Sequence, residues 1–188
     1  RTQQVAGAIH QLIRTEEIDL VIDLHEASIE YPVINAIVAH ETAGDLAAAA
    51  IFDLEMKGIQ FTLEPSPKNL HGLSHRELGD HLPGLFATLM ESANPIQGRL
   101  RGKTSTKQIL EGVDPCYVEA GEAGMNQVPF DSTGIPIERR VMRHIEGVQS
   151  LIAALDWVAP EKSMRLTGLP KKNILLKEGL TPYLNPTP

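Results

Sequence analysis

Hydrophobic and polar residues alternate along the chain with two different periods. Intervals of three and four positions predict helices, and the clearest of these occupy residues 2–17, 46–56 and 136–158. Short apolar or alternating runs predict strands at residues 18–24, 33–40, 59–63 and 86–91. Shorter helices are expected at residues 74–81 and 105–112. The order helix, strand, strand, helix, strand favours an α/β layered domain over a helical bundle or a β-sandwich.

The last part of the chain differs from the rest in composition. From Ala159 onward it contains prolines, lysines and one short apolar patch at residues 173–176. We therefore divide the chain into a domain at 1–158 and a C-terminal tail at 159–188. The tail is expected to dock as an edge strand or to contact a neighbouring subunit of a homo-oligomer.

Titratable side chains close two of the predicted strands. Asp23, His25 and Glu26 lie at the end of the first run or directly after it, and Glu91 ends the run at 86–91. Strands of open α/β sheets present functional groups at their carboxyl ends. His25 and Glu91 are therefore expected to share one cleft, although they lie 66 positions apart (91 − 25). His25 is a candidate metal ligand and Glu91 a candidate general base; the alternative is that both are ordinary strand-end residues.

A histidine-rich segment occupies residues 64–82. Ser74 and Glu77 have the spacing of a capping box, which predicts that the short helix begins at Ser74. On such a helix His75 points away from His71 and His81, so a three-histidine metal site is not expected there. The alternative is a solvated connection without a binding role.

One basic segment stands out from an acidic chain. Arg99 and Arg101 flank Leu100 between two glycines, and either they bind a substrate carboxylate or they are solvated turn residues. The net charge of −7 argues against nucleic acid as a partner. No apolar run approaches the roughly 18 residues that span a bilayer, so no membrane partner is expected. No signal peptide is visible, which favours a cytoplasmic protein.

Cys116 is the only cysteine, so the chain has no internal disulfide framework. A cysteine hydrolase that uses Cys116 is a weak alternative. Asp114 and Pro115 predict a turn rather than the helix start that lowers a thiol pKa.

Two motifs together resemble a known family. Asp23-Leu24-His25 ends a strand, and Glu91 opens a later Glu-Ser-Ala-Asn-Pro-Ile-Gln-Gly-Arg-Leu-Arg segment that ends at Arg101. The pair is similar to the second half of the zinc carboxypeptidase-like hydrolases, in the succinylglutamate desuccinylase and aspartoacylase branch. The resemblance covers roughly residues 2–158. It implies a mixed, mainly parallel sheet with helices on both faces, in a zinc-exopeptidase-like fold that lacks its N-terminal part.

The same resemblance assigns roles to individual residues. It implies that His25 is the last ligand of a Zn²⁺ ion, that Glu91 is the catalytic carboxylate, and that Asp23 orients His25. Arg99 or Arg101 is then expected to bind the substrate carboxylate. The family's other two zinc ligands lie in an upstream His-x-x-Glu motif, which this sequence does not contain. We therefore expect the chain to begin after that motif and to lack tight zinc binding by itself.

Two functions follow as hypotheses. The first is a zinc-dependent amide hydrolase in its complete form, either an N-acyl amino acid deacylase or a carboxypeptidase, acting on a small N-acyl amino acid or peptide. The second is a non-catalytic α/β fragment or degenerate relative, which binds a partner through its histidine-rich loop and its tail.

Overall fold

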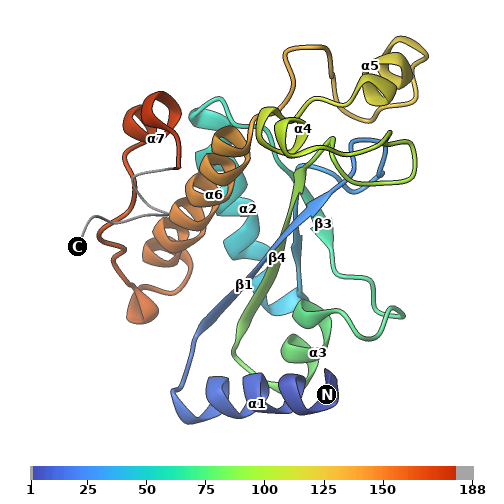
Figure 1. The fold of residues 1–188 in the computed structure, drawn as a ribbon. Coiled ribbons are helices and arrows are strands. Elements are labelled where there is room, and N and C mark those ends of the chain that lie inside the picture. Colours follow the sequence, from blue (N-terminus) through green and yellow to red (C-terminus); the bar gives the residue numbers. More distant parts are fainter. Residues whose placement is uncertain (1, 181–188) are drawn as a thin grey trace.

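The computed structural model describes residues 2–180, which form an α/β structure around a four-stranded mixed sheet (Figure 1). The strands are β1 (Leu20–Ala27), β2 (Ala36–Ala39), β3 (Thr62–Pro65) and β4 (Phe86–Ala93). Their order across the sheet is β1-β4-β2-β3. Strand β1 is parallel to β4 and β2 is parallel to β3, whereas β4 and β2 are antiparallel. The predicted α/β class with a mixed, mainly parallel sheet is therefore confirmed.

Helices cover both faces of the sheet. Helices α2 (Gly44–Met56) and α6 (Ile137–Val158) pack on one face, where Met90, Leu54 and Leu151 belong to one buried cluster. Helices α1 (Thr2–Thr15) and α3 (Ser74–His81) lie on the other face, where Ala87 packs with Ile13 and Leu78. Side chains of a strand point alternately to its two faces. Ala87 and Met90 are three positions apart in β4, so they point to opposite faces and belong to different clusters.

Two further helices lie beyond the carboxyl ends of β1 and β4. They are α4 (Thr106–Glu111) and α5 (Pro115–Glu122), and Figure 1 shows both at that end of the sheet. Tyr117 of α5 is fully buried in a third cluster that includes Ile29 and Ala93. Single 3-10 turns occupy η1 (Glu41–Ala43) and η2 (Pro160–Lys162).

Several predicted boundaries were wrong by a few residues. Strand β1 continues beyond Leu24 through His25 and Glu26 to Ala27, so these two polar residues lie inside the strand and not after it. Glu91 likewise lies two residues before the end of β4. The reason is backbone pairing: β1 and β4 stay in register from Leu20 and Phe86 to their last residues, and this ladder satisfies the polar backbone groups.

The capping box predicted for the helix at 74–81 was also wrong. Helix α3 has the predicted bounds, but Leu73 is its N-cap and no side chain caps it. Glu77 instead accepts a hydrogen bond from the backbone N–H of Gly72, at 2.8 Å. A capping box is present at α4, where Ser105 and Gln108 form both of its hydrogen bonds.

The C-terminal segment does not add a strand to the sheet within the described residues. Residues 173–176 lie in helix α7 (Lys172–Glu178), and Leu175 is fully buried where α7 packs against α6. The apolar patch is thus part of a helix and not a strand, with Leu175 on its buried side and Leu176 half-exposed. The part of the tail at 181–188 lies outside the described residues. Among residues 2–180, no helix combines the length and the apolar character that a bilayer crossing requires.

Candidate functional site

His25 and Glu91 lie side by side on neighbouring strands. They are register partners in the parallel pairing of β1 with β4, so both side chains point to the same face of the sheet. His25 Nδ1 lies 3.8 Å from Glu91 Oε2, and His25 Nε2 lies 3.2 Å from Asp23 Oδ1. The residues Asp23, His25 and Glu91 are called the histidine cluster below. Residues far apart in the sequence therefore meet in one place.

Burial distinguishes the two ends of the histidine cluster. The Glu91 side chain is 12% exposed, whereas that of His25 is 49% exposed. Burial raises the pKa of Glu91 above the ordinary glutamate value; the nearby His25 opposes this effect and Asp23 adds to it. A carboxylate with a raised pKa is a better proton acceptor than one in water, which is the property that a general base requires. The imidazole beside it is half-exposed to solvent.

Helix α3 adds two residues to the surroundings of the cluster. The Ser74 hydroxyl donates a hydrogen bond to Asp23 Oδ2, and the neighbouring His75 is buried with neither ring nitrogen hydrogen-bonded to a described residue. Burial lowers the pKa of His75, and the negative charge of Asp23 partly offsets this. Because Ser74 donates to Asp23 and not to His25, these residues do not form a serine–histidine–aspartate triad.

The position of α3 beside the histidine cluster was not predicted from the sequence. The only available signal was the mixture of serine and histidine in residues 64–82, and it did not indicate which strand the helix would cover. Of the three histidines there, His71 and His81 have exposed side chains and only His75 is buried.

Glu26, the third polar residue of the first predicted strand, has a structural partner instead. Its carboxylate accepts hydrogen bonds from Arg140 Nη1 at 2.8 and 3.0 Å and from Asn94 Nδ2 at 2.7 Å. Arg140 is buried on α6 and also donates to the carbonyl oxygen of Ile109. Glu26 therefore connects β1 to α6 and is not available for chemistry.

The two arginines assigned to substrate binding are both exposed. The Arg99 backbone N–H donates to Glu30 Oε1 at 3.3 Å, and Arg101 Nη1 is 3.5 Å from the Ile96 carbonyl oxygen. Neither side chain forms an ion pair with a residue of the histidine cluster, among the residues that the structure describes. Their role in binding a substrate carboxylate stays a prediction.

The histidine cluster does not fit a zinc ion as a complete site. No group of three or more histidine, cysteine, aspartate or glutamate side chains in residues 2–180 has the arrangement of a metal site. The two ring nitrogens of His25 face different carboxylates, so the three side chains do not converge on one point. A catalytic zinc site normally has three protein ligands and an open position.

The prediction of a simple turn before Cys116 was wrong. Helix α5 begins at Pro115, and Asp114 caps it by accepting a hydrogen bond from the Cys116 N–H at 2.8 Å. Desolvation and the adjacent Asp114 carboxylate nevertheless raise the pKa of the exposed Cys116 thiol. A raised pKa leaves little thiolate at neutral pH, so this thiol is a poor nucleophile despite its position at a helix start.

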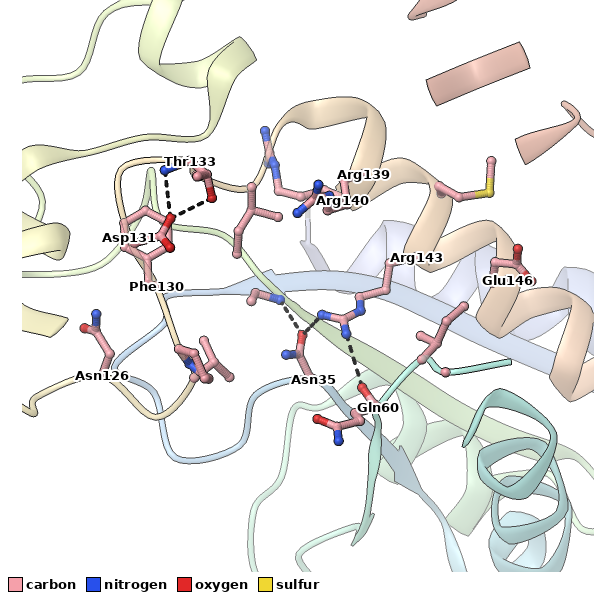
Figure 2. A pocket seen from close by; sticks show the side chains of 18 of the residues that line it. Asn35, Gln60, Asn126, Phe130, Asp131, Thr133, Arg139, Arg140, Arg143 and Glu146 are labelled. Carbon is pink, nitrogen blue, oxygen red and sulfur yellow. Dashed lines mark hydrogen bonds between the residues drawn. The ribbon is translucent and has the colours of Figure 1, made fainter. Parts of the chain in front are cut away.

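A cavity of about 1010 Å³ lies beside α6 and does not include the histidine cluster (Figure 2). Its wall comes from the start of α6, the loop at residues 126–135, the segment at 58–60, and single residues from elsewhere in the chain, among them Asn35. The cavity was not predicted from the sequence, because its residues come from segments that have no common motif.

Comparisons with known proteins add no assignment: the chain matched no protein-family model, no curated protein and no solved structure.

Proposed function

We propose that the polypeptide to which this chain belongs is an amide hydrolase, either an N-acyl amino acid deacylase or a carboxypeptidase with a zinc-exopeptidase-like fold. The observation that supports this proposal most strongly is the register of β1 with β4, which places His25 beside the largely buried carboxyl group of Glu91. The motif resemblance at Asp23 to His25 and at Glu91 to Arg101 gives the reaction class.

The residues of this chain have separate tasks in the proposed reaction. Glu91 accepts a proton from the water molecule that attacks the substrate carbonyl, and it passes that proton to the leaving amine. The raised pKa of Glu91 favours the first of these transfers, because the carboxylate binds a proton more readily than an exposed glutamate does. Asp23 lies 3.2 Å from His25 Nε2 and holds the imidazole in one orientation.

Zinc remains a prediction about a longer polypeptide. A bound zinc ion in such hydrolases polarises the carbonyl group and lowers the pKa of water. The described residues supply His25 as one ligand but no complete set, so two further ligands from outside the printed sequence are required.

The zinc part of the proposal is tested by metal analysis of the full-length protein. One zinc ion per chain is expected in the wild type, and His25→Ala is expected to lower this stoichiometry sharply, since one of three protein ligands is lost. His10→Ala is the matched control, because His10 lies on α1 and has no hydrogen bond to a described residue. Unchanged zinc content in His25→Ala would remove His25 from the metal site.

The second candidate function is a non-catalytic binding module. The cavity beside α6 favours it, because the cavity has the size of a ligand site and does not include the histidine cluster. Hydrolysis of N-acetylated amino acids or short peptides by the full-length protein separates the two candidates. Turnover supports the hydrolase, and its absence in zinc-loaded protein supports the binding module.

A further inference from the structure

Two arginines of α6 line the cavity without a carboxylate partner. Arg139 and Arg143 are one helical turn apart and therefore lie on the same face of the helix (Figure 2). Neither forms an ion pair with any residue in the range 2–180, whereas the neighbouring Arg140 is paired with Glu26 at 2.8 Å. The cavity thus has two positive charges that the described chain does not neutralise.

Arg143 is held in place by neutral groups. Its Nη1 donates to Asn35 Oδ1 at 2.7 Å, its Nη2 donates to the Gln60 carbonyl oxygen at 3.3 Å, and its guanidinium lies 5.2 Å from the centre of the Phe61 ring. Figure 2 shows this side chain reaching from α6 to both acceptors. Burial and the positive charge of Arg139 lower the pKa of Arg143, so the pair is electrostatically unfavourable by itself.

The two acidic residues of the cavity wall, Asp131 and Glu146, form no ion pair with Arg139 or Arg143 among the described residues, although the Asp131 carboxylate keeps its charge. Asp131 accepts hydrogen bonds from the N–H of Thr133 at 2.8 Å and from its hydroxyl at 2.6 Å. Glu146 lies 3.5 Å from Lys172 Nζ and 3.8 Å from Lys57 Nζ. A ligand with negative charge would therefore relieve an existing repulsion, whereas a cation would increase it.

The remaining wall indicates what the rest of the ligand is like. Apolar side chains contribute to it from three different segments, namely Ile59, Val128, Phe130 and Leu176. A volume of about 1010 Å³ is at the upper end for small-molecule sites, so the cavity is larger than a simple inorganic anion needs. Planar guanidinium groups bind carboxylate and phosphate with two parallel hydrogen bonds.

We propose that this cavity is a binding site for a small organic anion, in which Arg139 and Arg143 bind a carboxylate or phosphate group and the apolar wall holds its hydrophobic body. The site does not include Asp23, His25 or Glu91, so the proposal does not depend on the hydrolase function.

Isothermal titration calorimetry with three phenyl compounds tests the proposal. Phenylacetate and phenyl phosphate carry the two kinds of anionic group, and phenylacetamide is the neutral analogue of nearly the same shape. Both anions, or one of them, are expected to bind wild-type protein, and phenylacetamide is expected to bind at least about tenfold more weakly. The tighter of the two anions identifies the preferred group.

Variants of the full chain locate the site. Arg139→Gln and Arg143→Lys are each expected to weaken anion binding at least about tenfold, because one charge or one bidentate contact is lost. Arg139 is exposed and has no side-chain partner among the described residues, so its substitution leaves the fold intact. Arg165→Gln, which removes an equally exposed charge from another region, is expected to bind as the wild type does.

Three results would overturn the proposal. They are equal affinity for phenylacetamide, undiminished anion affinity in either Arg139→Gln or Arg143→Lys, and no binding of either anion at about 10 mM.

Discussion

The Tyr117 hydroxyl donates a hydrogen bond to the carboxylate of Glu30. Tyr117 is fully buried, and its hydroxyl lies 2.6 Å from Glu30 Oε2 and 2.9 Å from the Gln97 carbonyl oxygen. Burial by itself raises the pKa of Glu30, but hydrogen bonds from Tyr117, from Ser28 and from backbone amides hold it below the ordinary value. A buried tyrosine hydroxyl without this acceptor would lose a charge-assisted hydrogen bond.

We predict that Tyr117→Phe lowers the free energy of unfolding by about 2 kcal/mol at neutral pH. The size of this loss of stability depends on pH. Since folding lowers the pKa of Glu30, its contribution to stability is present above the ordinary glutamate pKa and is lost as pH falls through the folded pKa. The difference between wild type and Tyr117→Phe should therefore shrink in acid.

Urea unfolding followed by circular dichroism, at about pH 7 and about pH 3, measures this difference. Tyr31→Phe is the matched control, because Tyr31 is 49% exposed and should behave as wild type at both values. A difference for Tyr117→Phe that grows toward acid would contradict the assigned role of Glu30.

At the scale of elements, helix α4 ends at a position that only glycine fits. Gly112 has φ of +63°, and a Cβ atom there would overlap the carbonyl group of Ile135. The Gly112 N–H donates to the Gln108 carbonyl oxygen at 2.7 Å, and its own carbonyl accepts from the Ile135 N–H at 2.9 Å. This residue therefore ends α4 and also holds the segment that leads into α6.

We predict that Gly112→Ala destabilises the protein by more than about 2 kcal/mol, since backbone strain and a clash with rigid backbone add together. Gly124→Ala separates the two causes. Gly124 has φ of +70° but open space around its Cβ position, so only about 1 kcal/mol is expected. Thermal unfolding by calorimetry compares the two variants, and equal costs would show that the contact with Ile135 is not rigid.

Helix α7 contributes to the stability of the fold through Leu175, which is fully buried against α6, whereas its neighbour Leu176 is 49% exposed. Leu175→Ala should cost about 2–4 kcal/mol of unfolding free energy, and Leu176→Ala less than about 1 kcal/mol. Urea denaturation midpoints with unchanged slopes give both values. Similar small costs for the two variants would mean that α7 is not docked in solution.

At the scale of the whole molecule, sequence periodicity predicted the elements but not the way they assemble. The apolar stripe in residues 136–158 predicted the bounds of α6 to within one residue, because a long amphipathic helix follows mainly from local spacing. The run at 59–63 gave a strand that the structure has at Thr62–Pro65. The residues that form β3 are those that pair with the neighbouring strand β2. No local sequence pattern specifies this pairing.

The candidate site was predictable only in part for the same reason. The prediction that His25 and Glu91 lie together required only that two strands be neighbours and parallel, and the structure agrees. The nearness of α3 and the cavity beside α6 depend on packing between distant segments. Arg139 and Arg143 look like ordinary exposed helix residues in sequence. Only the structure shows that the partners of Arg143 are the neutral residues Asn35, Gln60 and Phe61.

The proposed hydrolase function depends on Glu91 being the proton acceptor. The most direct measurement is the turnover of an N-acyl amino acid by the full-length, zinc-loaded protein with Glu91→Gln, with Glu55→Gln as the control. Glu55 is exposed on α2 and has no ion pair within residues 2–180. We predict a loss of about 10²–10⁴-fold in kcat for Glu91→Gln, with zinc content retained and Glu55→Gln unchanged. Undiminished turnover by zinc-loaded Glu91→Gln would contradict the account.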